Sequence, residues 1–151
     1  MISKTGEMVW SGTDLRVARE ALGLSMKALA AALYNPSTDG PWRDSRIAEA
    51  EQGKRPVPDW LPTQVARLER VRDDLAADMV GALEASPGLV LIVHEQNRTF
   101  WTEHPEMRGV PAVVQRIAAG LAAAEIEQTT GRRPQVMAWR EPQSREPDFH
   151  W

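Results

Sequence analysis

A long amphipathic helix, predicted between two proline-containing breaks, limits most strongly what this chain can fold into. KRPVPD precedes the helix and Ser86-Pro87-Gly88 follows it, and a residue before proline is pushed out of the helical region. We predict that Asp59 caps this helix and that Pro62 lies in its first turn. A helix of about 25 residues is ~37 Å long, more than a compact three-helix unit needs, so its far end should belong to the second half of the chain. Apolar residues recur along it at spacings of three, four or seven: Leu61, Val65, Leu68, Leu75, Met79 and Leu83.

Two short helices are predicted near the N-terminus. The first covers Thr13–Leu22, because the Thr13 hydroxyl can cap it, Asp14 lies in its first turn and a glycine follows it. Ser25 stands at the N-cap of the second helix, which covers Met26–Leu33 and consists of strong helix formers. Only a short turn separates the two helices.

A third helix is predicted from about Trp42 to Gln52, with Ile47 and Ala50 facing inward and a glycine as its C-terminal stop. YNPSTDGPW at residues 34–42 precedes it. The Asn-Pro, Asp-Gly and Gly-Pro pairs in that segment cannot continue a helix, so we predict a loop.

The C-terminal half is predicted to contain two strands separated by helices. Leu89–Val93 and Gln135–Trp139 are the strands, and Asn97–Glu103 and Val110–Glu125 are the helices. A right-handed crossover of this kind gives a parallel pair of strands. Two strands alone make a poor sheet, so helices or a second subunit must cover them. We therefore expect this half to form a homodimer, through the apolar residues Leu89, Leu91, Val113, Val114, Ile117 and Leu121.

These elements predict a mainly α protein with a small α+β C-terminal part. We expect a three-helix domain at residues 12–60, a long connecting helix at 61–86 and a small two-stranded α/β dimerisation domain at 87–140. The segment REPQSREPDFHW that follows is polar and interrupted by proline. A disordered tail is therefore predicted at 141–151.

Composition and charge narrow the function classes. The chain has no cysteine, which excludes disulfides, thiolate metal sites and thiol catalysis. It has no apolar run of about 20 residues and no signal-peptide pattern at its start, so we expect a cytoplasmic protein without a membrane partner. The net charge is −3, but eleven Lys or Arg face nine Asp or Glu up to residue 72, and seven face twelve after it. A mildly basic first half and an acidic second half fit a nucleic-acid reader joined to a partner-binding part.

LRVAREALGLSMKALAAAL, followed by RIAEAEQGKRPVP, resembles the Xre/Cro-type helix-turn-helix, a lambda-repressor-like domain. The chain is most similar to the YdiL-like helix-turn-helix proteins, which include anti-CRISPR-associated autorepressors. The likeness extends from about Leu15 to Ile126. In these proteins the helix-turn-helix ends in E-x-G-K-x-x-x-P-D, which matches Glu51, Gly53, Lys54, Pro58 and Asp59. A later stretch similar to FWTEHPEM matches Phe100–Met107.

The resemblance implies a repressor that binds an inverted repeat in double-stranded DNA, in its own or a neighbouring promoter. The third helix would enter the major groove, with its N-terminal side chains on base edges and nearby cations on phosphates. Arginine can bridge guanine, and glutamate can accept from cytosine. The implied base-reading residues are Arg43, Ser45, Arg46 and Glu49. The implied phosphate-binding residues are Ser25, Lys27, Lys54 and Arg55.

The chain departs from the family pattern at two positions. The usual Gly-Val-Ser turn is replaced by the longer segment 34–42. Where the family usually has a tryptophan, this chain has Ala50. We expect Trp42 or Trp60 to fill the volume that this alanine leaves, and the six tryptophans in general to pack in the core. Three acidic residues also lie on or beside the third helix: Asp44, Glu49 and Glu51.

Other readings of the same residues remain open. Arg43 and Arg46 could form a solvated face paired with the neighbouring acids, and Lys54 with Arg55 could neutralise a helix end. The chain could then be a protein-interaction module, antitoxin-like or phage-encoded, or an RNA-binding regulator. We expect no enzyme, because no nucleophile, base and orienting group occur together, and no cofactor. His94, His104 and His150 lack ligand spacing, so no metal site is expected.

Overall fold

The computed structural model describes residues 9–141, and the predicted tail at 141–151 lies outside this range except for its first residue. As predicted, the described part is mainly helical, with a small parallel pair of strands towards its C-terminal end. It contains no helix that is both long and apolar enough to cross a membrane.

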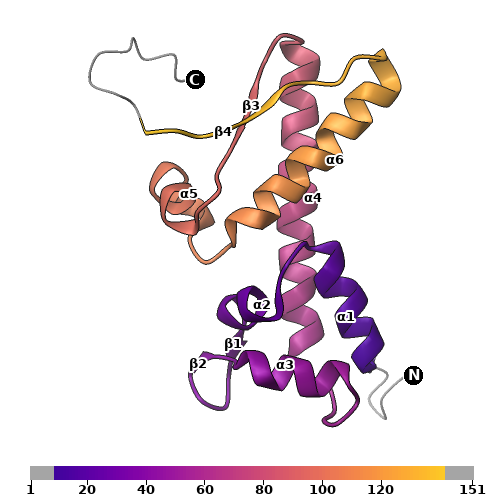
Figure 1. Cartoon of the computed structure of the whole chain (residues 1–151), viewed down its shortest axis with the longest axis vertical. Helices are drawn as coiled ribbons and strands as arrows, with labels where there is room; N and C mark the ends of the chain where they lie inside the picture. The colour runs from indigo at the N-terminus through magenta and orange to yellow at the C-terminus, as the bar shows by residue number, and fades with distance from the viewer. Residues whose placement is uncertain (1–8, 142–151) are drawn as a thin grey trace.

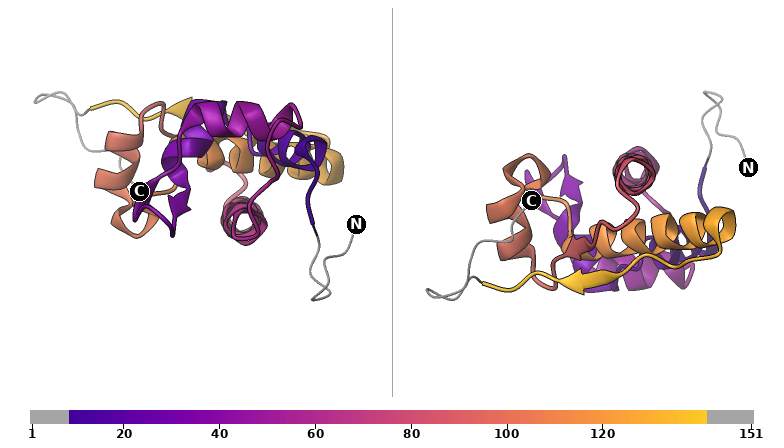
Figure 2. Two further views of the ribbon diagram at one scale, coloured as in Figure 1. Left: turned by 90° about the horizontal axis from the view of Figure 1, so that it is seen from below. Right: turned by 90° about the horizontal axis from the view of Figure 1, so that it is seen from above.

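Helix α4 (Leu61–Ala85) is the axis of the molecule, as its predicted length required. The helices α1 (Gly12–Ala21), α2 (Met26–Ala32) and α3 (Asp44–Glu51) lie around its N-terminal half, and α6 (Ala112–Thr130) runs along its C-terminal half (Figure 1). Seen end-on, α4 has α6 and the N-terminal helices on one side (Figure 2). The other side of α4 faces solvent.

The capping residues explain where the first helices begin. Ser11, rather than Thr13, caps α1: its hydroxyl accepts the Asp14 N–H at 3.1 Å, and the Asp14 carboxylate accepts the Ser11 N–H at 2.8 Å. Such a reciprocal pair satisfies two helix-end donors at once. The prediction for α2 is confirmed, since the Ser25 hydroxyl accepts the Ala28 N–H at 3.0 Å.

The segment before α3 is a small hairpin and not only a loop. Strand β1 (Tyr34–Asn35) pairs antiparallel with β2 (Gly40–Pro41). Gln64 on α4 fixes its base, because the side-chain amide accepts the Tyr34 N–H at 2.8 Å and donates to the Tyr34 carbonyl at 2.7 Å. The predicted break in the helical pattern is therefore correct, but the turn residues fold back into a ladder anchored on α4.

The predicted start of α4 and both predicted ends of α6 are also wrong. Trp60, not Asp59, occupies the N-cap position of α4, and its side chain makes no capping hydrogen bond. Helix α6 begins at Ala112 and continues to Thr130, five residues beyond the predicted end at Glu125. Nothing in the sequence breaks α6 before Gly131, whose positive φ of 75° closes the helix.

The remaining C-terminal elements follow the predicted order. Strand β3 (Leu91–Val93) pairs in parallel with β4 (Val136–Ala138), with Leu91 opposite Val136. Helix α5 (Asn97–Glu103) and the 3₁₀ turn η1 (Pro105–Met107) lie between β3 and α6. The predicted parallel crossover is thus confirmed.

The boundary between the two hydrophobic clusters does not coincide with the predicted boundaries between domains. One cluster joins the first three helices and the start of α4 to α5 and the start of α6, through Phe100, Val110, Ala112 and Val114. A second, smaller cluster lies at the other end between α4, β3 and α6, and contains Leu83, Leu91, Val93, Ala119, Ala122 and Ile126. The first three helices therefore share their core with the second half of the chain.

The turn between α1 and α2 makes this sharing close. At Gly23 a Cβ atom would lie 2.8 Å from Cδ1 of Ile117 and 3.3 Å from Cγ2 of Val113, both on α6. Only a glycine leaves room for that approach, and its φ of 71° also favours glycine. Helix α6 is thus seated directly on the turn that precedes α2.

Candidate nucleic-acid interface

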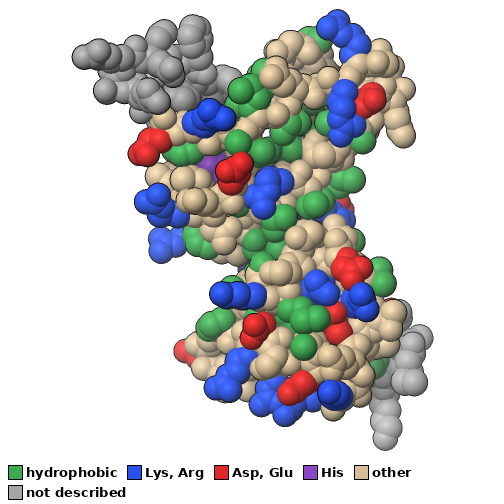
Figure 3. Space-filling view, viewed as in Figure 1, with side chains coloured by type: hydrophobic (Ala, Val, Ile, Leu, Met, Phe, Trp, Pro, Cys, Tyr) green, Lys and Arg blue, Asp and Glu red, His purple; other side chains and the backbone are tan. Residues whose placement is uncertain are grey.

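Helix α3 lies at the end of the molecule away from the parallel strands (Figure 1). Some of its side chains are buried and others are exposed. Ile47 and Ala50 are fully buried against the neighbouring helices, as predicted. Arg43 and Ser45 are exposed, and Arg46 is half-buried. In the space-filling view, Lys and Arg side chains gather along this end, with some carboxylates between them (Figure 3).

The N-terminal end of α3 presents Arg43 and Ser45 without fixing their side chains. Arg43 is the N-cap residue in an extended conformation and makes no capping hydrogen bond with its side chain. The carboxylate of Asp44 accepts the Ser45 N–H at 2.9 Å, so this acid satisfies a donor of its own helix. It also suits the positive end of the helix dipole. Asp44 therefore has a structural role, and the side chains beside it can reach a ligand.

Glu49 is held by two arginines. Its carboxylate lies 3.4 Å from Nη1 of Arg46 and also accepts a hydrogen bond from Nε of Arg55. These side chains are between 35% and 51% exposed, so each pair contributes little to stability and separates readily. The cluster carries a net positive charge. Glu49 limits the freedom of Arg46 without cancelling the cations around it.

Glu51 is internal and not a surface acid. Its side chain is 4% exposed and forms a two-pronged pair with Arg19 of α1, at 2.7 and 3.0 Å. Arg19 also donates to the carbonyl of Leu24 at 2.9 Å, and the hydrogen bonds to Glu51 raise the pKa of Arg19. One of the three acids that the sequence placed on or beside the third helix therefore does not oppose an anionic ligand.

The predicted phosphate-binding residues lie on both sides of α3. Lys54 and Arg55 are exposed just after Gly53, and the Lys54 N–H donates to the Glu49 carbonyl at 2.9 Å, which fixes this corner. Lys27 is exposed on α2. The hydroxyl of Ser25 accepts the Ala28 N–H, so its own proton remains available to an anion.

Two hollows beside α3 involve residues that the sequence reasoning missed. One, of about 450 Å³, separates the hairpin from α3 and is lined by Asn35, Thr38, Gly40, Pro41, Trp42, Arg43 and Arg46. The other, of about 320 Å³, lies beside Trp42, Trp60 and Arg55. Arg46 lines both. The Asn-Pro and Asp-Gly turn signals could have indicated a hairpin next to the third helix. They could not have indicated on which side of that helix the hairpin lies.

The tryptophan prediction is confirmed for the two residues near Ala50. Trp42 and Trp60 meet edge-to-face with ring centroids 5.5 Å apart, and both pack against the cluster that contains Ala50. Both rings are only partly buried at the edge of that cluster. This packing supports the base of α3.

The residues predicted for dimerisation are dispersed. Leu91 and Val114 are 3% and 0% exposed within one chain, so they leave no surface for a partner. Val113 and Ile117 are half-buried against the α1–α2 turn, and Leu89 lines a cavity described below. The apolar stripe of α6 packs against the N-terminal helices of the same chain. Of the predicted set, Leu121 is the exposed member, at 47%.

Two exposed apolar residues of the C-terminal half were missed. Val136 and Met137 on β4 are 40% and 47% exposed. Within residues 9–141, β4 pairs with β3 alone, so its other edge has no strand beside it. The sequence did contain a signal for this exposure: QVMAW is rich in apolar residues, and the predicted strand had only one partner strand.

Nothing in the described range gathers metal-ligand side chains, since residues 9–141 contain no group of three or more His, Cys, Asp or Glu placed to hold an ion. The arrangement around α3 is therefore one of exposed cations and hydrogen-bond donors on a helix with a firmly packed base. Such groups can form charge-assisted hydrogen bonds with anions. Neither a family model nor a curated protein matches the chain.

Proposed function

We propose that this chain is a sequence-specific DNA-binding repressor that acts as a homodimer. Helices α2 and α3 form a helix-turn-helix, and α3 enters the major groove. The observation that carries the proposal is the two-sided construction of α3: Ile47 and Ala50 are buried, while Arg43, Ser45 and Arg46 project from its N-terminal end. A single α-helix fits the major groove of B-DNA, and side chains at its N-terminal end reach the base edges.

The cations around α3 fall into two groups with different tasks. Arg43 is the N-cap residue of α3 and Arg46 lies in its first turn, with Ser45 between them. In the proposal these three side chains read bases. Lys54, Arg55, Lys27 and Ser25 flank the helix and are placed to bind the phosphate backbone, which fixes the register of the protein. Glu49 can accept from cytosine once Arg46 turns towards DNA.

Exposed apolar side chains in the C-terminal half of the chain support the homodimer. Leu121, Val136 and Met137 are apolar and at least 40% exposed, and among residues 9–141 no strand lies beside the outer edge of β4. Pairing two such edges would bury these side chains and the unpaired backbone groups. Because α6 is seated on the α1–α2 turn, the spacing between the two α3 helices would then be fixed, as an inverted repeat requires.

Selection of duplexes from a random-sequence DNA pool by the full chain tests this proposal. Enrichment of one inverted repeat, with half-sites about one helical turn apart, is the expected result. The double variant Ser45→Ala with Arg46→Ala should lose the enrichment, while Arg98→Ala, an exposed site on α5, should retain it. A pool that stays unenriched, or tighter retention of RNA than of duplex DNA, would overturn the proposal.

The alternative of a protein-interaction module rests on the net charge of −3 and on the acids of α3, of which Asp44 is exposed and Glu49 is half-buried. A heparin column separates the two. Retention that falls steeply with salt supports a nucleic-acid surface, and passage without retention supports the protein-binding alternative.

A further inference from the structure

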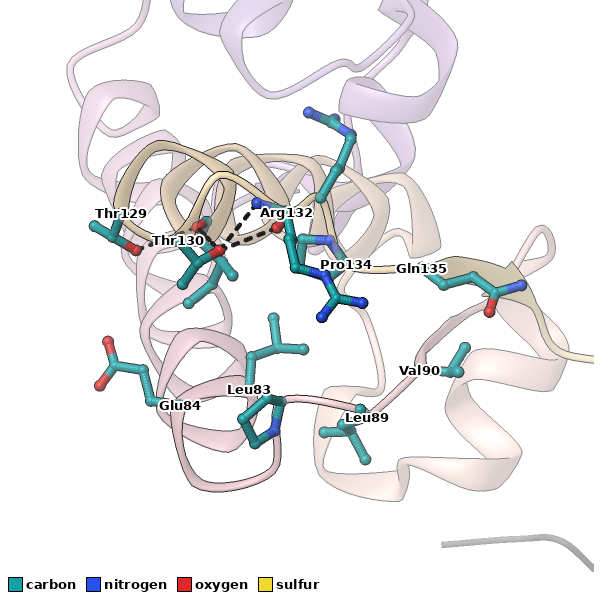
Figure 4. Close-up of a pocket in the computed structure, with 13 residues that line it drawn as sticks. Leu83, Glu84, Leu89, Val90, Thr129, Thr130, Arg132, Pro134 and Gln135 are labelled. Atoms are coloured by element: carbon teal, nitrogen blue, oxygen red, sulfur yellow. Dashed lines mark hydrogen bonds between the residues drawn. The ribbon is translucent and has the colours of Figure 1, made fainter.

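A cavity of about 470 Å³ opens at the end of the molecule opposite α3. It lies between the last turn of α4, the connection into β3, and the segment that leads from α6 into β4 (Figure 4). Its volume falls within the range of small-molecule sites, which is about 300–1,000 Å³. Its lining residues include Leu83, Leu89, Ile126, Thr130, Arg132 and Pro134.

The inner surface of this cavity is apolar. Leu83 and Ile126, at 2% and 8% exposure, belong to the second hydrophobic cluster, and Leu89 packs against that cluster. Pro87 and Pro134 add apolar surface on two connecting segments. An apolar chain or ring can therefore leave water by entering the cavity.

The polar rim leaves one cationic group available. Thr130 donates its hydroxyl proton to the Ile126 carbonyl at 2.7 Å, and Thr129 likewise donates to a carbonyl of α6. Arg133 is paired with Glu127 at 2.8 Å. Within residues 9–141 the ion pairs of this region do not include Arg132, which Figure 4 shows at the rim above Leu83 and Leu89.

The backbone that carries Arg132 is held in place. The Thr130 hydroxyl accepts the Arg132 N–H at 3.2 Å, across the turn that Gly131 makes with its positive φ.

Glu84 is the one carboxylate among the lining residues, and Figure 4 shows it on the opposite side of Leu83 from Arg132. The cavity therefore has an apolar interior, a cation on one side of its mouth and an anion on the other.

We propose that this cavity binds a small amphipathic carboxylate: an unbranched acyl chain or an aromatic ring that carries one carboxylate group. The apolar part occupies the space over Leu83 and Ile126, and the carboxylate pairs with Arg132. Arginine suits this task, because its planar guanidinium can donate two parallel hydrogen bonds to a carboxylate. The proposal does not depend on DNA binding.

Arg132 could instead serve only to stabilise the end of α6, and this alternative predicts a different result. A cation just beyond the C-terminal end of α6 also neutralises the negative end of the helix dipole. If that were its whole role, replacing Arg132 would lower thermal stability but leave no ligand affinity to lose. Binding must therefore be measured directly.

Titration of the full chain with octanoate, followed by calorimetry, is the first measurement. One octanoate should bind per chain, and the neutral isostere octanamide should bind more weakly. Arg132→Gln should weaken octanoate binding about tenfold, the lower end of what a hydrogen bond to a charged group contributes. Arg98→Gln, at an exposed position of α5 that does not line the cavity, should leave the affinity unchanged.

A second variant and a mapping experiment place the ligand. Leu89→Trp fills the cavity and should abolish binding of both octanoate and octanamide. Amide chemical-shift changes on adding octanoate should be confined to residues around Leu83, Leu89 and Ile126. Absence of saturable binding, equal binding of octanoate to the Arg132→Gln variant and the original chain, or shift changes centred elsewhere would each overturn the proposal.

Discussion

The guanidinium of Arg19 on α1 and the carboxylate of Glu51 at the end of α3 form a two-pronged ion pair, with hydrogen bonds of 2.7 and 3.0 Å. Both side chains are almost fully enclosed, at 12% and 4% exposure. The pair fixes the orientation of α3 relative to α1. It also removes the Glu51 charge from the surface that α3 presents.

Replacing Arg19 by methionine leaves the buried Glu51 carboxylate without its partner. We expect the free energy of unfolding to fall by about 3 kcal/mol, because a buried charge that loses its partner is strongly destabilising. Urea denaturation measures this. Arg16→Met is the matched control: it breaks an exposed pair with Glu20 and should change the midpoint little. Equal effects of the two substitutions would contradict the structural role of Arg19.

At Gly12 the start of α1 approaches the end of α3 closely. A Cβ atom there would lie 2.2 Å from the Ala50 carbonyl oxygen and 2.8 Å from that of Glu51. Gly12→Ala should destabilise the protein by about 1–3 kcal/mol, as other overpacked sites do. Gly120→Ala, in α6 with open space around it, should instead stabilise by roughly 0.5–1 kcal/mol, because alanine is the better helix former. Thermal unfolding distinguishes these opposite signs.

His94 connects the parallel strands to α5 and α6. Its ring stacks on Trp139 with centroids 5.3 Å apart and meets the ring of His104 edge-on at 5.7 Å. The Gln115 side chain accepts its backbone N–H at 2.9 Å, and Arg116 donates to its carbonyl at 2.5 Å. Burial, with a smaller effect from His104, lowers the pKa of His94 below its usual 6.5, while Glu103 acts weakly in the opposite sense.

This lowered pKa predicts a loss of stability in mild acid. Below about pH 6.5 the unfolded chain takes up a proton on His94 while the folded chain does not, so the free energy of unfolding falls as the pH falls from 7.5 to 5. The variant His94→Phe should show a smaller slope in that range. Denaturant titrations at a series of pH values measure the difference, and identical slopes for the two proteins would exclude His94 as the cause.

The proposed dimer predicts which apolar residues hold two copies together. Met137→Glu and Leu121→Glu each place a charge on an exposed apolar position of the C-terminal half and should shift the chain from dimer to monomer. Val17→Glu is the control, because Val17 is 62% exposed on α1, on the other half of the chain. Sedimentation at tens of micromolar measures the state. An original chain that sediments as a monomer would exclude this interface.

Local signals in the sequence predicted most of the fold. The long helix, the Ser25 cap and the parallel strands each depend on neighbouring residues: a run of helix formers between prolines, a hydroxyl before a helix, and apolar runs either side of a crossover. The misassigned cap of α1 is of the same kind. Ser11 and Thr13 both precede or open the helix with a hydroxyl, and only Ser11 has an acid three residues later.

Long-range packing could not be predicted in this way. The stripe of Val113, Val114 and Ile117 indicated that one face of α6 is buried, but periodicity carries no information on what covers it. In the structure Val114 is buried within the chain, and Val113 and Ile117 pack against the α1–α2 turn and are half-buried. Likewise, the spacing of Glu51 placed it near the surface of α3, and only the fold brings Arg19 to it.

The last prediction separates base reading from phosphate binding, and it compares Arg46 with Lys54. Arg46 lies in the first turns of α3, and Lys54 lies past the end of the helix. In the proposed complex Arg46 would therefore reach base edges and Lys54 would lie beside the DNA backbone. Arg46→Ala should cost about 1–3 kcal/mol on the selected duplex and little on a scrambled one, since a lost bidentate contact removes discrimination. The fold should survive, because Glu49 keeps its pair with Arg55.

Lys54→Ala should weaken binding to both duplexes alike. It should also reduce the slope of log affinity against log salt concentration by about one, because one fewer counterion is released on binding. Isotherms on the two duplexes at several salt concentrations measure both quantities, with Arg98→Ala as the control that should change neither. If Arg46→Ala weakens the selected and scrambled duplexes equally, then Arg46 contacts the backbone as Lys54 does, and α3 does not read bases through it.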